Sequence, residues 1–275
     1  MSHKKRILIV TPEMDPYIEF SEAAKVIYNY PAKLHERAGM EMRVLMPRFG
    51  IINERRHRLH EVVRLSGINI IIDEDDYPLL IKVASLQGVR LQTYFLDNDE
   101  FFNRKSVFHD DEGNFYDDNT ERMVFFCKGV LETVKKFGWA PDIVMCFGWM
   151  TSLLPLYGKV AYKNDPIFNK AKYIYIPFRN DYTGTLGEKF SAKAPIKELD
   201  LSQLKHYGTT SNNDMHRGGI YHSDGIVVGS PDLDPEILAL IDEVSTTKPV
   251  LPYMESPDYL EVYKTFFSLF DQTSE

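Results

Sequence analysis

The chain alternates between short apolar runs and longer segments with helical periodicity. Residues 7–10 are apolar throughout and Pro12 follows them, which is typical of a buried parallel strand that ends in a loop. From Ser21 to Gly39 apolar residues recur every three or four positions, which predicts an amphipathic helix, and residues 42–47 form a second strand. A strand, a helix and a strand in this order are a βαβ unit, which builds parallel sheets with right-handed connections.

The same alternation continues toward the C-terminus. A long helix is predicted over residues 119–137, with Asp118 or Asn119 as its cap. Further strands are predicted at residues 68–72, 79–85, 91–95, 142–146, 173–176 and 225–229, and further helices at 53–64, 151–162, 235–243 and 257–270. This order indicates an α/β protein with a single Rossmann-like, doubly wound parallel sheet.

One long segment interrupts the pattern. Residues 181–213 are rich in polar residues and glycine and show little periodicity. Connections of this length without regular structure are uncommon inside a compact domain, and they usually lie on the surface. We therefore predict a mobile surface segment here.

Composition narrows the function classes. The chain has 275 residues, and 32 Lys and Arg against 40 Asp and Glu give a formal charge of −8. This acidic balance argues against a duplex nucleic-acid binder, which would need a net basic face. No apolar stretch reaches the ~18 residues of a membrane span or has the flanks of a signal peptide, so we expect a cytoplasmic protein. Cys127 and Cys146 have apolar or aromatic neighbours, which predicts buried thiols in a reducing compartment.

The search for reactive groups finds little. His57 and His60 lie in a basic stretch without a carboxylate pair, so no metal site is predicted. No Gly-x-Gly-x-x-Gly follows the first strand, so we predict no dinucleotide cofactor. Carboxylates and aromatic residues interleave over residues 97–118. Such a mixture suits either a sugar site or an ordinary solvated loop with aromatic anchors, and composition leaves both interpretations open.

Several motifs occur in the order and spacing of one enzyme family. They are Pro12-Glu13-Met14, Val44-Leu45-Met46-Pro47, Tyr116-Asp117-Asp118-Asn119, Trp139 with Pro141-Asp142, and Gly229-Ser230-Pro231. These motifs resemble the start of the bacterial ADP-glucose-dependent glycogen and starch synthases, and the likeness runs over roughly residues 5–240.

The resemblance implies a retaining glucosyltransferase fold of two Rossmann-like halves, the GT-B arrangement, with the active site in the cleft between them. In that family the N-terminal half holds the glucan acceptor, and the C-terminal half holds most of the ADP-glucose. The chain is long enough for one half. The resemblance thus assigns residues 1–244 to a synthase N-terminal-like domain, and we expect residues 245–275 to be a tail helix that packs back on it.

The residues that carry chemistry in the family are replaced here. The family's Lys-x-Gly-Gly-Leu loop, which receives the donor diphosphate, reads Glu19-Phe20-Ser21-Glu22-Ala23, and Lys25 stands where the family has an acid. Its His-x-His-x-Trp-His stretch becomes residues 145–150, where only Trp149 is kept, and its Thr-Ile-His-Asn becomes residues 175–178, Tyr-Ile-Pro-Phe. We therefore predict a degenerate donor-phosphate loop at Glu19, Ser21, Glu22 and Lys25, and assign no catalytic residue.

The resemblance and the losses together predict a glycogen/starch synthase-like protein of α-1,4-glucan metabolism. It would be an acceptor-side domain that cannot transfer glucose alone and that binds an α-glucan or a protein partner supplying the donor-binding half. Asp118, Asn119 and Trp149 are its candidate acceptor contacts, although Asp118 and Asn119 equally suit a plain helix cap. Two alternatives stay open: a functional half of a split glucosyltransferase, or a recruited Rossmann-like domain with another ligand.

Overall fold

The computed structural model describes residues 4–37, 39–86, 88–89, 91–179, 182–197, 199–255 and 259–271. Its strands are β1 Arg6–Val10, β2 Glu41–Pro47, β3 His60–Glu61, β4 Ile68–Ile72, β5 Asp75–Leu86, β6 Leu91–Asp97, β7 Ile143–Phe147, β8 Lys172–Ile176, β9 Gly225–Val227 and β10 Val250–Leu251. Its helices are α1 Ala23–Arg37, α2 Glu54–His57, α3 Asp99–Phe102, α4 Asn119–Phe137, α5 Leu153–Lys159, α6 Phe190–Lys193, α7 Asn212–His222, α8 Pro235–Val244 and α9 Tyr259–Ser268, with 3₁₀ turns η1 Trp149–Thr151 and η2 Leu201–Tyr207.

The strands of the described residues form one sheet in the order β10-β9-β8-β7-β1-β2-β6-β5-β3, with β4 paired to β5. All neighbours from β10 to β6 run parallel. Strand β5 runs antiparallel to β6, β3 and β4, so the sheet has a mixed edge that the predicted parallel sheet lacks. The prediction of a Rossmann-like α/β sheet is otherwise confirmed.

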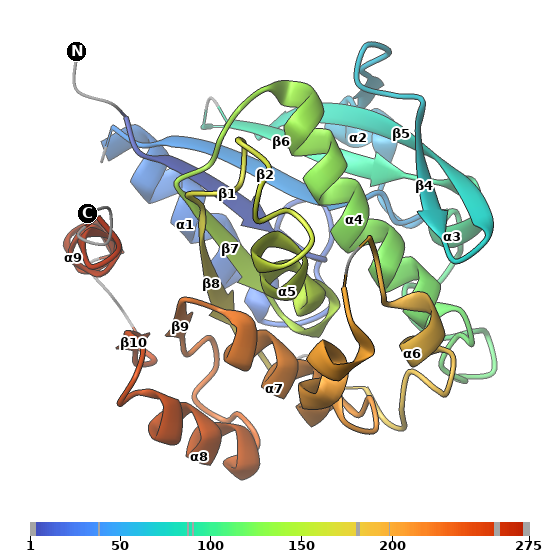
Figure 1. Ribbon diagram of the computed structural model, residues 1–275. Helices are drawn as coiled ribbons and strands as arrows, with labels where there is room; N and C mark the ends of the chain where they lie inside the picture. Colours follow the sequence, from blue (N-terminus) through green and yellow to red (C-terminus); the bar gives the residue numbers. More distant parts are fainter. Residues whose placement is uncertain are drawn as a thin grey trace.

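Helices cover both faces of the sheet. Figure 1 shows α4 and α5 in front of the strands and α1 behind them. Residues 7–10 in the central strand β1 are fully buried, which explains their uninterrupted apolar run. Helix α4 ends at Gly138, whose φ of 62° lies in the left-handed region that favours glycine. None of the described helices is long and apolar enough to cross a membrane.

Two predicted helices are shorter than the sequence pattern suggested. Residues 53–64 were predicted to be helical, but α2 is a single turn: Asn53 caps it, and Arg58 ends it with a φ of 56°. The chain then extends as β3 and pairs with β5, because the edge of β5 offers free backbone groups. The helix predicted over residues 151–162 begins earlier, as the 3₁₀ turn η1, and α5 ends at Lys159.

The segment predicted to be mobile is packed. Within the described residues 182–197 and 199–213 it contains α6 and η2, and Phe190 and Tyr207 are buried as anchors. Side-chain caps at Asp200 and Ser211 fix the starts of η2 and α7. The elements are too short to show a helical period, which is why the pattern predicted a loose loop. The predicted first residue, Asp181, lies outside the described residues.

The tail contacts helix α1 and Lys5, the residue directly before β1. Helix α9 lies against α1, and Lys5 Nζ donates to the backbone oxygen of Phe267 and pairs with Asp271 at 2.7 Å. Upstream of α9, Lys248 Nζ donates to three carbonyl oxygens at the end of α7. The predicted start of this helix, Pro257, lies outside the described residues. A domain boundary at residue 244 stays a prediction.

Candidate functional site

The candidate site lies where the parallel strands end. Strands β1, β2, β6, β7, β8 and β9 all point their carboxyl ends to one edge, and ligands of open α/β sheets bind outside that edge. A pocket of about 710 Å³ opens there, with Glu22, Lys25, Phe178, Arg179 and Asp232 in its wall. The predicted donor-phosphate loop, which leads from β1 into α1, therefore borders this pocket.

A buried carboxylate holds that loop. Glu13 follows β1 and is 1% exposed, and its Oε2 accepts hydrogen bonds from the backbone N–H groups of Phe20 and Ser21 at 3.1 and 2.8 Å. Its other oxygen accepts from the Ser21 hydroxyl. Burial raises the pKa of Glu13 more than these hydrogen bonds lower it. Sequence reasoning missed Glu13 as a site residue, and its place directly after the first strand was the available signal.

Three charged side chains of the loop pair with one another. Lys25 Nζ lies 2.8 Å from Glu19 and 3.7 Å from Glu22, so two carboxylates and one ammonium leave a net charge of −1. The hydrogen bond to Glu19 raises the pKa of Lys25 and keeps it charged. All three side chains are well exposed, so water screens the pairs. The structure thus brings Glu19, Ser21, Glu22 and Lys25 together.

Asp118 and Asn119 do not cap α4. Asp118 occupies the cap position, but its side chain makes no capping hydrogen bond, because both carboxylate oxygens bind the guanidinium of Arg104. Asn119 is buried, donates to the carbonyl of Phe108 and accepts from Arg122. The plain-cap interpretation is therefore wrong for Asp118. Arg104 lies 14 residues before Asp118, so no local sequence pattern could predict that the two side chains pair.

Trp149 lies in an aromatic cluster of Phe108, Phe115, Trp149 and Tyr182. It is 1% exposed, and its ring centroid lies 5.0 Å from Phe108 and 4.8 Å from Tyr182. Phe115 stacks on Tyr182 at 4.8 Å. The rings contact each other more than solvent, as expected for aromatic anchors. Trp149 and Asn119 therefore support the wall of the site from inside, while Asp118 stays partly exposed.

The positions where the family has imidazoles are apolar and closed. Met145 and Phe147 at the end of β7, Met150 in η1 and Pro177 directly after β8 are all buried. Cys127 and Cys146 are free and buried, as predicted, and burial raises the pKa of both thiols. Within the described chain, no group of three His, Cys, Asp or Glu could hold a metal ion. The methionine, phenylalanine and proline side chains at the family's imidazole positions offer no hydrogen-bond donor to a sugar or a phosphate.

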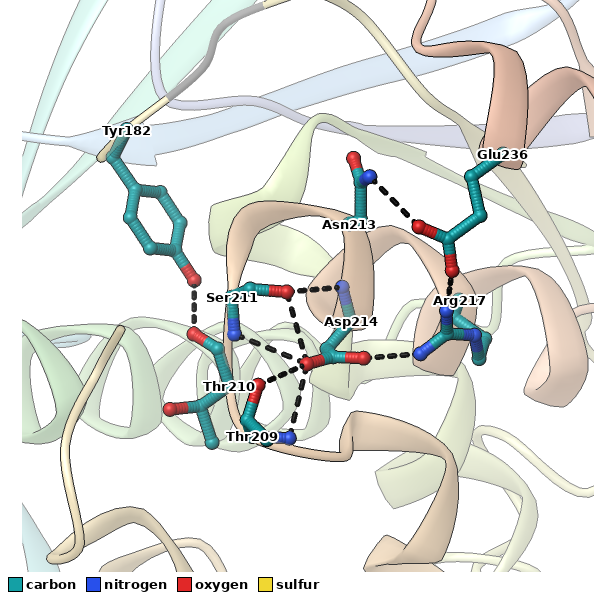
Figure 2. A network of polar contacts seen from close by, with 8 residues as sticks. All are labelled: Tyr182, Thr209, Thr210, Ser211, Asn213, Asp214, Arg217 and Glu236. Carbon is teal, nitrogen blue, oxygen red and sulfur yellow. Dashed lines mark hydrogen bonds and ion pairs between the residues drawn. The ribbon is translucent and has the colours of Figure 1, made fainter. Parts of the chain in front are cut away.

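A network of hydrogen bonds and ion pairs fixes the start of α7, at the same carboxyl edge of the sheet (Figure 2). The Asp214 carboxylate accepts from the backbone N–H and hydroxyl groups of Thr209 and Ser211, and Arg217 links it to Glu236. Burial alone would raise the pKa of Asp214, but these hydrogen bonds and the Arg217 charge outweigh it and lower the pKa. The Tyr182 hydroxyl donates to Thr210 O at 2.7 Å, which ties the network to the aromatic cluster.

Comparisons with known sequences point to one family. The family model described as "Starch synthase catalytic domain" matches residues 6–244. The glycogen synthase of Chlorobium luteolum is 40% identical over 235 residues, which cover 85% of this chain and 47% of the relative. The glycogen synthase of Chlorobium limicola is 35% identical over 220 residues, covering 80% and 44%. The chain therefore spans less than half the length of these relatives.

A solved structure shares the fold. The catalytic domain of starch synthase IV from Arabidopsis thaliana, bound to ADP and acarbose, aligns with a TM-score of 0.73 at 18% identity. The alignment covers 94% of this chain and 52% of that one. At this identity the likeness supports the arrangement of strands and helices only.

Proposed function

The chain belongs to the starch synthase catalytic domain family, and from that premise we propose that it is an acceptor-side domain of α-1,4-glucan metabolism. It binds an α-glucan at the carboxyl edge of its sheet and does not transfer glucose from ADP-glucose by itself. The observation that carries this proposal lies in the loop between β1 and α1, where the protein's own carboxylates already bind the N–H groups and the ammonium that a donor phosphate would need.

That loop has its own anions where a donor phosphate would need amides and a cation. Backbone N–H groups of Phe20 and Ser21 already donate to Glu13, and the ammonium of Lys25 is shared by Glu19 and Glu22. A diphosphate approaching this loop would be repelled by its net negative charge. It would also have to displace the carboxylates that already accept hydrogen bonds from these N–H groups and from Lys25. Met145, Phe147 and Met150, which stand where the family has histidines, offer it no compensating donor.

The glucan contact is proposed for an adjoining pocket of about 480 Å³. Phe20, Ile51, Phe108 and His109 line it, and Phe20 is 37% exposed. The rings of Phe20 and Phe108 meet edge to face at 5.5 Å, which leaves one face of Phe20 for the apolar face of a sugar. Lys105 in the same wall can donate to hydroxyl groups. Asp118 and the buried Asn119 and Trp149 hold this wall from behind.

A functional half of a split transferase is the second candidate. The observation that favours it is the match over residues 6–244, which preserves the scaffold of the N-terminal half. In that case a separate protein of the same family supplies the donor-binding half, and transfer requires both.

Calorimetric titration of the full chain tests the proposal. We expect maltoheptaose to bind with a Kd of about 1 mM or tighter, and ADP-glucose to give no saturable heat up to about ten times that concentration. The variant Phe20→Ala should weaken maltoheptaose binding by about fivefold, because a sugar–aromatic contact of ~1 kcal/mol is lost. The variant Val63→Ala, at an exposed apolar position outside the pocket, serves as the matched control.

Two results would count against the proposal. Saturable ADP-glucose binding in the micromolar range would mean that the loop accepts a donor after all. Equal loss of glucan binding in the Phe20 and Val63 variants would mean that the proposed pocket is not the glucan site.

A further inference from the structure

A second pocket, of about 440 Å³, lies away from the candidate site. It is lined by Arg43 near the start of β2, by Gln92 and Tyr94 near the start of β6, by Arg64 after β3 and by Lys136 at the end of α4. Because β2 and β6 run parallel, these positions lie toward the amino-terminal edge of the sheet, opposite the edge where the loop after β1 lies. The pocket therefore belongs to neither proposed contact.

The wall of this pocket is cationic without an opposing carboxylate. Arg43, Arg64, Lys136 and His60 line it, and no Asp or Glu of the described chain does. Among the described residues, neither arginine nor Lys136 has a carboxylate within the 4.0 Å of an ion pair. Three cationic side chains around one cavity are unexpected in a chain of net charge −8, because like charges repel and acids are plentiful.

Arg43 is held in place with its donors unused. Its guanidinium lies over the rings of Phe137 and Trp139, 4.7 Å from each centroid, which fixes its plane. None of its guanidinium N–H groups has an acceptor among the residues that the structure describes. Half-burial lowers the pKa of Arg43; Tyr94 and Glu41 raise it and Arg6 and Arg64 lower it, so burial decides the direction. A bound anion would stabilise this half-buried charge.

The neighbouring groups also present donors. The Tyr94 hydroxyl donates to Gln92 Oε1 at 2.6 Å, so the amide nitrogen of Gln92 is directed to donate elsewhere. Lys136 Nζ uses one donor on Ser66 O at 3.0 Å and has two more. A group that accepts from several directions at once, and carries more than one negative charge, matches this arrangement better than a single carboxylate.

We propose that this pocket binds the phosphate group of a small phosphorylated molecule, with Arg43 as the fixed anchor and Arg64 and Lys136 as flexible partners. The cavity is several times larger than a phosphate ion, which leaves room for an organic part. The site is independent of glucan or donor binding at the other edge.

Titration of the full chain at low ionic strength tests this site with three probes: inorganic phosphate, inorganic pyrophosphate and glucose 1-phosphate. We expect saturable 1:1 binding of at least one probe with a Kd near or below about 1 mM. The double variant Arg64→Gln/Lys136→Gln should weaken it by at least about tenfold, since both partners contribute charge-assisted hydrogen bonds. Both side chains are exposed, so this variant should fold.

The matched control is Arg55→Gln/Arg56→Gln, which removes the same charge from exposed positions outside the pocket. It should change the Kd less than about twofold, because surface charges at a distance are screened. If inorganic phosphate binds as tightly as the sugar phosphate, the ligand is the free ion, and tighter binding of glucose 1-phosphate indicates an ester. Absence of saturable binding by all three probes, or equal weakening in the pocket and control variants, would overturn the proposal.

Discussion

Replacing Asp97 by asparagine is expected to lower the free energy of unfolding by about 3 kcal/mol, because it leaves a buried arginine and a partly buried lysine without their partner. The Asp97 side chain is 3% exposed, and its two oxygens lie 2.9 Å from Arg48 Nε and 2.9 Å from Lys82 Nζ. Glu54 also contacts both cations and offsets part of the loss. Urea unfolding of Asp97→Asn against the wild-type chain measures the difference.

Asp99 provides the matched control for this experiment. Its carboxylate lies 3.5 Å from the same Arg48, but its side chain is 81% exposed. We expect Asp99→Asn to change the free energy of unfolding by no more than ~0.5 kcal/mol, because water screens an exposed pair. Similar losses in the two variants would show that burial does not decide the strength of this network, contrary to our account.

The second large effect is acid destabilisation by buried histidines. Burial lowers the pKa of His216 to about 4, and burial together with nearby cations lowers that of His222 to about 4. The ordinary value is 6.5, so below pH 6.5 the unfolded chain takes up protons that the folded chain refuses. Stability therefore falls as the pH drops from 6.5 to 4, by roughly 3 kcal/mol for His216 alone, and levels off below the folded pKa.

Unfolding free energies measured between pH 7 and pH 5 test this dependence before most carboxylates titrate. The buried Glu13 works in the opposite direction, because burial raises its pKa, but mainly at the acidic end of this range. The variant His216→Gln keeps a polar group beside Tyr175 and should flatten the slope by less than half, because it removes one of the two largest histidine contributions. His57 and His206, whose pKa values burial also lowers, keep contributing. Parallel slopes for the variant and the wild-type chain would contradict the assignment to His216.

Local pattern predicted those elements whose own residues decide their structure. Residues 7–10 form β1 because a strand buried on both faces must be apolar throughout, and α4 follows its apolar face to Gly138. The prediction of a helix over residues 53–64 was wrong because His60 and Glu61 pair as a strand with the edge of β5, which lies more than 20 positions away in the chain. Long-range pairing of this kind leaves no local signal.

The same limit applies to the candidate site. Sequence grouped Glu19, Ser21, Glu22 and Lys25 because they follow one another between the first strand and the first helix. It could not show that Lys25 pairs with both glutamates, since this depends on side-chain orientation at the start of α1. The binding role of the loop, and of Asp118, Asn119 and Trp149, stays a prediction.

The most direct test of the central claim is transfer itself. The full chain is incubated with radiolabelled ADP-glucose and maltoheptaose, and label in the glucan is followed with time against a blank without protein. We predict no incorporation above the blank, because the loop between β1 and α1 already binds its own carboxylates in place of a donor phosphate. Time-dependent elongation of maltoheptaose by this chain alone would contradict the account.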